Sequence, residues 1–542
     1  MEALGKAEPF RTSGGRAALG CYLSGTLTRP WPACILMLCF LFLLLSLKSL
    51  ATDSHIEECQ RLMASGNLEA AEHEARLALS DPATKALGLA ILGAIRLQQM
   101  KTQEGIAFLK EAIQTDPRLV GARLNLGEAY SRAGKTVEAR EAYQQALRLK
   151  PDSTVARLDL AQLEASAGNY AASLRVAEPI APLLRGSPAG ILVLATDYFG
   201  LKKKALADPL VAQWKNLKEV PEPLSLEFAQ LLAKESLTAA ALSVLEPYEK
   251  AGTPPSFELA YALAGLHVQE GNFESASGYY ETALKLNATC VLCLQSLAKT
   301  AEKQNETEKA LAYLIKARRL SPEDAGVLFD YGRVCLERDL LDDGLEALEK
   351  AVRLRPDNDH YVYVLASGYV SKAHYAKAQT LLEGLLKKRP NDSVLHYALG
   401  TVFYLEAEFD AAEASLKKSV ELNADQTGSY YYLGLTAEKK KNYLLAERIF
   451  TNLLKQHPEH TPSYSALGTV LVEMKKYAEA QPILEKAIRL DPSSTQGHYQ
   501  LAIVLGRIGK HEEAAKEAAL ALECEKKERV EGRKLQTHIL MP

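Results

Sequence analysis

The sequence has few of the signals that usually accompany catalysis. It contains no G-x-S-x-G, H-E-x-x-H or P-loop motif, and no G-x-G-x-x-G opens a helix after a strand. Its 11 histidines are dispersed, and no β-strand pattern leaves room for a fused enzyme domain. We therefore expect a protein that is not an enzyme, with no catalytic residues, no metal site and no cofactor.

Excess charge of one sign is also missing. The formal net charge is −3 over 542 residues. A nucleic-acid-binding protein usually presents a basic surface to the phosphate backbone. We therefore expect no nucleic acid among the partners.

Cysteine is scarce and scattered. The eight cysteines suggest no disulfide framework. Cys290 and Cys293 form one C-x-x-C, which indicates redox or metal chemistry in a suitable context. No second pair lies nearby to complete four metal ligands, and a free cysteine behaves as a small buried hydrophobe. Packing is the favoured interpretation, and a redox or metal-binding protein is the alternative from another functional class.

Long apolar runs are limited to one segment near the N-terminus. Trp31–Leu47 has 17 residues without a charge, near the lower limit for a membrane-spanning helix. Basic residues precede it, so residues 1–30 are predicted to form a cytoplasmic tail and the rest to be extracytoplasmic. The alternative is a signal peptide that ends at residue 51, which would give a periplasmic or secreted protein. We expect a single-pass membrane protein with a signal anchor at 31–47.

The remainder of the chain repeats at an interval of 34 residues. The interval is marked by Pro322, Pro356, Pro390, Pro458 and Pro492. In the repeat that starts at Thr427, positions 7, 8, 20, 24 and 32 are Leu433, Gly434, Ala446, Phe450 and Pro458. Recurrence at a period of this size indicates a repeat array.

This pattern resembles the L-G-x-x-Y…A-x-x-x-F/Y-x-x-A…P pattern of the tetratricopeptide repeat family, in arrays of the membrane-anchored or exported bacterial type. The resemblance implies an all-α fold: a right-handed superhelical solenoid of helix-turn-helix repeats, here with one N-terminal apolar membrane segment. It also implies a concave groove that binds a protein or peptide partner. The oligomeric state stays open.

The register of the pattern divides the chain into segments. We assign 51–175 to N-terminal repeats, 176–256 to divergent repeats, 257–528 to regular repeats and 529–542 to a C-terminal cap and tail. The divergent segment holds closely spaced prolines, which end helices. Its apolar stretches still have lengths that suit two helix pairs.

Aromatic side chains recur at position 5 of the regular repeats. In the family, this position and its neighbours line the concave surface, so we predict a ligand-binding surface there. Its candidate residues are Tyr261, Phe329, Arg333, Tyr363, Tyr397, Tyr404, Tyr431 and Tyr499. Rigid aromatic side chains often anchor interfaces. The alternative is that these rings only pack against the adjacent helix.

Together these observations predict a non-enzymatic scaffold for protein–protein interactions, displayed on the extracytoplasmic side of a membrane. An adaptor for envelope or polysaccharide assembly or export is the alternative within binding proteins.

Overall fold

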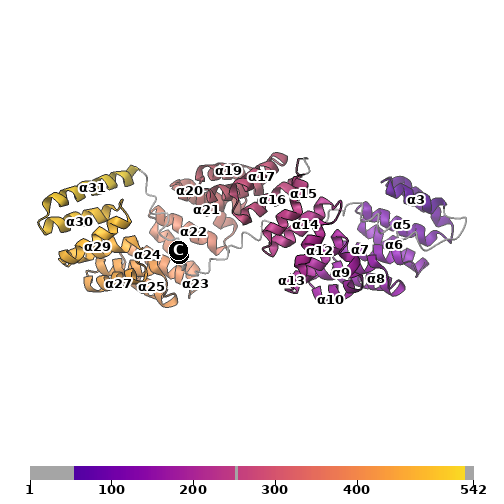
Figure 1. Ribbon diagram of the computed structural model, residues 1–542, viewed down its shortest axis with the longest axis horizontal. Coiled ribbons are helices and arrows are strands. Elements are labelled where there is room, and N and C mark those ends of the chain that lie inside the picture. Colours follow the sequence, from indigo (N-terminus) through magenta and orange to yellow (C-terminus); the bar gives the residue numbers. More distant parts are fainter. Residues whose placement is uncertain (1–53, 251–253, 531–542) are drawn as a thin grey trace. The chain divides into compact units, whose positions relative to one another are not determined.

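The computed structural model describes residues 54–250 and 254–530 (Figure 1). Within these ranges the secondary structure is helical and includes no strand, which confirms the predicted all-α fold. The chain divides into two compact units, Met1–Leu286 (unit 1) and Asn287–Pro542 (unit 2). In each unit, the described helices form seven pairs, and the two helices of a pair follow one another in the sequence and pack together.

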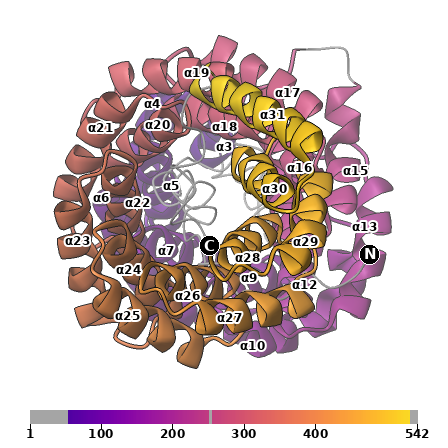
Figure 2. The same ribbon diagram turned by 90° about the vertical axis from the view of Figure 1, so that its left-hand side faces the viewer.

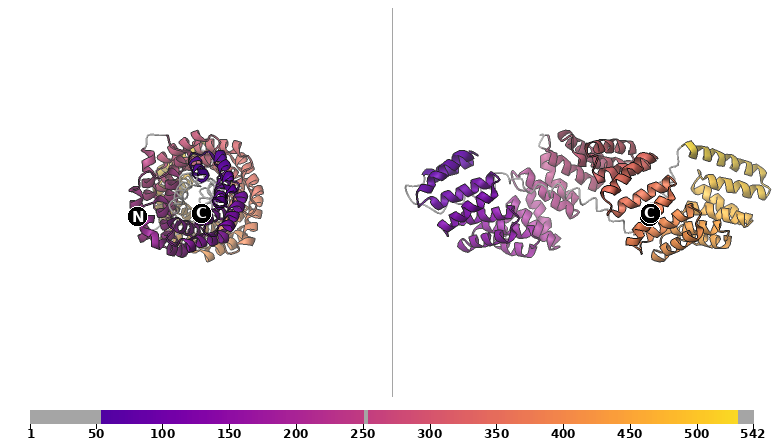
Figure 3. Two further views of the ribbon diagram at one scale, coloured as in Figure 1. Left: turned by 90° about the vertical axis from the view of Figure 1, so that its right-hand side faces the viewer. Right: turned by 180° about the vertical axis from the view of Figure 1, so that it is seen from behind.

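Unit 1 contains the N-terminal and divergent repeats and one regular repeat (Figure 3). Its described α-helices are α3 (Ser54–Ala64), α4 (Leu68–Leu77), α5 (Lys85–Gln98), α6 (Thr102–Thr115), α7 (Val120–Arg132), α8 (Thr136–Leu149), α9 (Thr154–Ser166), α10 (Tyr170–Ala177), α11 (Ala181–Leu184), α12 (Pro188–Gly200), α13 (Lys204–Lys215), α14 (Glu222–Lys234), α15 (Thr238–Glu249), α16 (Phe257–Glu270) and α17 (Phe273–Leu286). The short 3₁₀ helices η2 (Ala78–Ser80) and η3 (Glu178–Ile180) extend α4 and α10.

Unit 2 contains the other regular repeats. Its described helices are α18 (Val291–Lys303), α19 (Thr307–Leu320), α20 (Ala325–Glu337), α21 (Leu341–Leu354), α22 (Asp359–Ser371), α23 (Tyr375–Lys388), α24 (Ser393–Leu405), α25 (Phe409–Leu422), α26 (Thr427–Lys439), α27 (Tyr443–Gln456), α28 (Thr461–Glu473), α29 (Tyr477–Leu490), α30 (Thr495–Arg507) and α31 (His511–Val530). Within this unit, the even-numbered helices lie on the inner side of the curve and the odd-numbered helices from α19 to α27 on the outer side (Figure 2).

The two helices of a pair approach closely because position 8 of the repeat is small. A Cβ atom added to Gly468 in α28 would lie 2.2 Å from Cδ2 of Leu484 in α29. The same holds one repeat earlier, where a Cβ atom on Gly434 would lie 2.5 Å from the ring of Phe450. A real Cβ atom does not fit at such a distance, so glycine at position 8 makes room for the large side chain at position 24.

Between the two helices of each pair, the chain turns at a residue in the left-handed conformation. This residue also recurs at an interval of 34 residues. One register contains Gly66, Met100, Gly134, Gly168, Lys202 and Ser236, and the second contains Gly271, Asn305, Asp339, Ala373, Ala407, Lys441, Lys475 and Gly509, each with φ between 57° and 85°. Glu219 also has a positive φ but lies outside both registers. A left-handed residue ends the first helix and turns the chain back. The two registers differ by one residue because Ser236 and Gly271 are 35 apart.

The predicted membrane localisation requires correction. None of the helices in 54–250 and 254–530 is long and apolar enough to span a membrane. The 20-residue helix α31 carries many charges, and the other helices of unit 2 have at most 14 residues, whereas a span needs about 20 apolar ones. Trp31–Leu47, the tail at 1–30 and the cleavage site at residue 51 lie outside the described residues.

Candidate binding surface

The predicted binding residues of unit 2 lie on the helices of its inner side. Their positions are Phe329 and Arg333 in α20, Tyr363 in α22, Tyr397 and Tyr404 in α24, Tyr431 in α26 and Tyr499 in α30. Tyr261 belongs to α16 of unit 1, where its ring meets that of Tyr280 edge-on at 5.4 Å. Seven of the eight candidates therefore share one unit.

The aromatic rings at position 5 differ in exposure. Phe329, Tyr363 and Tyr397 are buried, whereas Tyr431 is half-buried and Tyr499 is 55% exposed. Two of the buried rings, those of Phe329 and Tyr397, contact the next repeat. Phe329 stacks on Tyr361 of α22 with ring centroids 4.3 Å apart.

Tyr397 shows how a glycine of the next repeat covers a ring. A Cβ atom on Gly428 would lie 2.8 Å from Cε2 of Tyr397. The ring therefore lies directly against the start of α26, where a larger residue would not fit. A direct contact between Tyr397 and a ligand stays a prediction.

Five rings of α24, α26 and the turn before α28 form what we name the tyrosine cluster. Its members are Tyr397, Tyr404, Tyr431, Tyr432 and His460. Tyr432 meets Tyr404 edge-on at 5.4 Å and Tyr431 at 5.5 Å, and Tyr431 meets His460 at 5.5 Å. Edge-on packing at such distances is favourable for aromatic rings. The cluster therefore forms a continuous aromatic contact across two inner helices.

The hydroxyl groups of the tyrosine cluster remain protonated. Burial, followed by the nearby Glu438 carboxylate, raises the pKa of Tyr404 to about 12. Burial and the neighbouring Tyr404 and Glu438 raise the pKa of Tyr431 to about 12 as well. Both tyrosines are half-buried, so part of each side chain faces solvent. The cluster offers apolar rings together with neutral hydrogen-bonding groups.

Arg333 belongs to a second group of side chains, which we name the charged cluster. Its guanidinium contacts both carboxylate oxygens of Glu302 in α18, at 2.7 and 2.8 Å, and donates to Glu337 at 2.6 Å. Gln295 donates to Asp330 at 3.0 Å, and Lys299 pairs with Asp330 at 3.5 Å. Burial raises the pKa of Glu302, and Arg333 partly offsets this rise. Because two carboxylates already neutralise Arg333, its free charge for a ligand is small.

Sequence reasoning missed several members of these clusters. Tyr432 and Asp330 both occupy position 6 of their repeats, next to the predicted position 5. Glu302 occupies position 12, which the pattern places one helical turn from position 9 on the same face. The recurring spacing could have identified position 6, since it is adjacent to the aromatic position.

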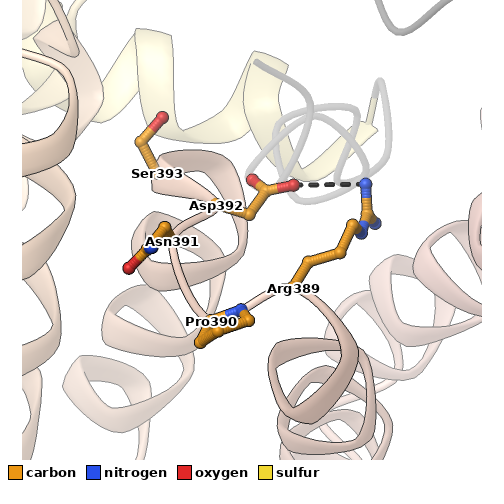
Figure 4. Close-up of a pocket in the computed structure, with 5 residues that line it drawn as sticks. All are labelled: Arg389, Pro390, Asn391, Asp392 and Ser393. Carbon is orange, nitrogen blue, oxygen red and sulfur yellow. Dashed lines mark ion pairs between the residues drawn. The ribbon is translucent and has the colours of Figure 1, made fainter.

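An open pocket lies at the turn between α23 and α24 (Figure 4). It is lined by Arg389, Pro390, Asn391, Asp392 and Ser393. Asp392 accepts hydrogen bonds from the backbone N–H groups of Val394 and Leu395 and pairs with Arg389 at 3.2 Å. These contacts cap the N-terminus of α24, and this structural role accounts for Asp392 and Arg389 without a bound ligand.

The described residues do not assemble a metal site. In 54–250 and 254–530, no three His, Cys, Asp or Glu side chains gather in a way that could hold an ion. The side chains of the two clusters on the inner side of unit 2 supply aromatic rings, hydroxyl groups and paired charges.

Comparisons with known proteins match these repeats. Among curated proteins, protein O-mannosyl-transferase TMTC1 of Homo sapiens is 30% identical over 147 residues, which are 25% of this chain and 17% of that protein. Superkiller protein 3 of Schizosaccharomyces pombe is 29% identical over 112 residues, 21% of this chain and 8% of that protein. The chain therefore spans less than a fifth of these curated relatives.

Among solved structures, the crystal structure of the APC/C hetero-tetramer Cut9–Hcn1 is similar, with a TM-score of 0.41 and 14% sequence identity. The match covers 85% of this chain and 97% of that one. The family comparison extends along both units. Its matched residues are 132–191, 257–290, 296–359, 363–427, 429–460 and 465–527. These matches cover more than half of the sequence, and the chain belongs to the tetratricopeptide repeat family.

Proposed function

We propose that unit 2 is a scaffold without catalytic activity that binds a protein segment along its inner helices. The tyrosine cluster is the observation that carries this proposal. Tyr404 and Tyr431 are half-buried, so each is held in place by packing while part of its side chain can meet a partner. Tyrosine anchors of this kind dominate many interfaces because they contribute large contact area with little loss of side-chain entropy.

The charge distribution suggests which part of a partner would bind there. Positions 5, 6 and 9 of α22, α24, α26 and α28 carry no charged residue. The charged cluster of α18 and α20 holds several charges, which pair with one another. The carboxylate near Tyr404 and Tyr431 is that of Glu438, which pairs with Lys439 at 3.4 Å. A partner segment with uncharged, partly apolar side chains therefore complements the tyrosine cluster, because a buried unpaired charge would be costly.

The alternative of an adaptor for envelope or polysaccharide assembly stays a prediction. No contact within the described part of the chain favours it over a general scaffold.

Affinity capture with a pair of matched variants tests the proposal. Tyr431→Ala removes a half-buried ring of α26 on the inner side, and Tyr477→Ala removes a half-buried ring at the start of α29. We expect the first variant to weaken partner binding by at least about tenfold, as for an interface hot spot. The second should leave binding unchanged, and circular dichroism should show native helicity for both.

Equal capture of every partner by the wild type and by Tyr431→Ala would contradict the proposal. Equal loss in both variants would also count against it, because binding would then depend on general stability and not on the tyrosine cluster.

A further inference from the structure

Cys290 and Cys293 are linked covalently in addition to being packed in the interior. Both are buried, as the packing interpretation predicted, but their sulfur atoms are joined in a disulfide, with Cα atoms 5.3 Å apart. This Cα distance lies within the normal range for a disulfide. The pair lies at the first turn of α18, where unit 2 begins.

The position of Cys290 is normally occupied by an oxygen-bearing cap. Cys290 precedes α18, and its sulfur accepts the backbone N–H of Cys293 at 3.0 Å. The equivalent residues of four of the six other repeats in unit 2 cap their helices with side-chain oxygens: Asp324, Asn358, Asp392 and Ser494. Sulfur is a weaker acceptor than oxygen. Capping alone therefore does not explain cysteine here, and the second cysteine one turn later requires its own explanation.

The other described cysteines lack the features of a reactive site. Cys59, Cys335 and Cys524 are buried and unbridged. Burial raises the pKa of Cys59 to about 12 and raises that of Cys335 as well. A thiol held protonated in this way is a poor nucleophile. Cys59 and Cys335 are therefore poor candidates for thiol chemistry, whereas the Cys290–Cys293 pair has a bond that a thiolate can attack.

We propose that Cys290 and Cys293 are a reversible thiol–disulfide site whose co-substrate is an external dithiol. Cys290 is the sulfur that reacts first, since it is 5% exposed and Cys293 is fully buried. The N-terminus of a helix also stabilises a thiolate through its unpaired N–H groups and dipole. This inference concerns α18 and does not depend on the binding function proposed above.

The exchange balances without any further reactant. One thiolate of the dithiol attacks Cys290, the Cys290–Cys293 bond breaks, and Cys293 leaves as a thiolate that takes up a proton. The second thiol of the reagent then attacks the reagent sulfur that is bonded to Cys290, and Cys290 is released as a thiol. Two electrons and two protons pass to the pair, and the reagent leaves as its disulfide.

The redox state should change the first turn of α18. The disulfide ties the cap residue to the third residue of the helix, and reduction leaves only the weak N–H to sulfur contact. The same helix carries Gln295 and Lys299, which contact Asp330 of α20. Reduction therefore loosens the end of the helix that helps to hold the charged cluster.

Tryptic mass spectrometry of the full-length chain can test the proposal. Cleavage after Lys285 and Lys299 releases Leu286–Lys299, which contains both cysteines of the pair and no other. The native chain would be incubated at graded ratios of reduced to oxidised dithiothreitol, alkylated, and then digested. We expect this peptide to change reversibly from the disulfide form to the doubly alkylated form. Amide exchange at Cys293 and Leu294, whose N–H groups bond to Cys290, should become roughly tenfold faster when so short a ring opens.

Cys335 and a serine variant supply the controls. The tryptic peptide Val334–Arg338 contains Cys335, which should stay unalkylated in the native chain at every ratio. Cys290→Ser retains a cap like that of Ser494 and should make amide exchange in α18 independent of dithiothreitol. A pair that never oxidises, that resists reduction until the chain unfolds, or that reduces only together with alkylation of Cys335 would overturn the proposal.

Discussion

The divergent helices α12–α15 and the regular helices α24–α27 have the same backbone period but different side chains at several positions of the repeat. Lys202 and Ser236 turn the chain in the first group, with φ of 58° and 59°, as Ala407 and Lys441 do in the second. Positions 8 and 20 also stay small, with Ala195 in α12 as one buried example. The helix pair is therefore maintained where the sequence pattern weakens.

The divergent and the regular repeats also differ at position 27. This residue is buried Ser419 in α25 and buried Leu453 in α27, and in other regular repeats it is a buried alanine, such as Ala351 and Ala487. In the divergent repeats it is Trp214 or Tyr248. Trp214 stacks on Phe228 with ring centroids 4.4 Å apart, and the Tyr248 hydroxyl donates to the carbonyl of Val220 at 2.5 Å. In the divergent repeats, Trp214 and Tyr248 therefore make specific contacts at a position where several regular repeats have a small residue.

Trp214→Ala should destabilise the divergent repeats more than any other change considered. The change restores the alanine of regular repeats, yet it empties a site where the side chain is 3% exposed. Removal of a buried tryptophan costs about 4 kcal/mol of unfolding free energy, because the cavity closes only in part. Hydrogen exchange of α13 and α14 should accelerate sharply, since neighbouring repeats carry most of each other's stability.

Leu183→Ala provides the matched control. Leu183 lies in the same divergent segment but is 63% exposed, so its truncation should change stability by less than about 0.5 kcal/mol. If Trp214→Ala were as mild as this control, the divergent repeats would be packed like the regular ones.

A buried polar pair that joins α10 to the divergent helix α12 is a second difference from the regular repeats. Ser173 of α10 donates to Oδ2 of Asp197 in α12 at 2.6 Å, and Oδ1 of Asp197 has no hydrogen-bond partner. Both side chains are fully buried. The equivalent positions in two successive regular repeats hold Ala446 and Val470, which are also fully buried. Burial raises the pKa of Asp197 to about 7.

The pH dependence of stability follows from this raised pKa. Asp197 binds its proton more tightly in the folded chain than in the unfolded chain, where its pKa is about 3.9. Its favourable contribution is complete below pH of about 4, falls as pH rises toward about 7 and is gone above that value. We expect unit 1 to lose on the order of a few kcal/mol between these limits, measured by hydrogen exchange of α10 and α12.

The double variant Ser173→Ala with Asp197→Val replaces the polar pair by alanine and valine, which occupy the equivalent positions in two successive regular repeats. Replacing both partners of a buried polar pair by apolar groups is often stabilising. We expect the variant to be more stable than the wild type at pH 8 and to lose the pH dependence in α10 and α12. If the opening free energy of these helices in the wild type, obtained from exchange rates corrected for the intrinsic pH dependence of amide exchange, were the same at pH 5 and pH 8, Asp197 would not be buried as described.

The fold could be predicted from the sequence because its determinants are local and repeat. Glycine or alanine at position 8 and proline at position 32 directly mark the close approach and the end of the second helix. The divergent segment was harder to align, because Trp214 and Tyr248 stand where the pattern expects alanine. The left-handed turn residue would have kept the register, but it is glycine in only some repeats and otherwise Lys, Ser, Ala, Asp, Asn or Met.

The binding surface was less predictable, because a ring's exposure depends on the next repeat. Position 5 places an aromatic residue on the inner helix, but the next repeat determines whether its ring is exposed. Tyr361 covers Phe329, and the close approach of Gly428 covers Tyr397. These contacts join residues about 30 positions apart, and one repeat considered alone does not contain them. The disulfide at Cys290 is also not predictable from the C-x-x-C spacing, because this spacing alone does not distinguish packing from redox chemistry.

Glycine substitutions at the left-handed turns should change stability only slightly. Lys202→Gly and Ala407→Gly each replace an exposed residue that has φ near 60°. The left-handed conformation costs a residue with a side chain roughly 1–2 kcal/mol, whereas glycine loses about 0.5–1 kcal/mol through the greater freedom of the unfolded chain. We therefore expect both variants to gain about 0.5 kcal/mol in urea denaturation. Because the turn conformation is the same in α12–α13 and α24–α25, the two gains should be equal within error; a gain in Ala407→Gly alone would mean that the divergent repeats hold this turn by other contacts.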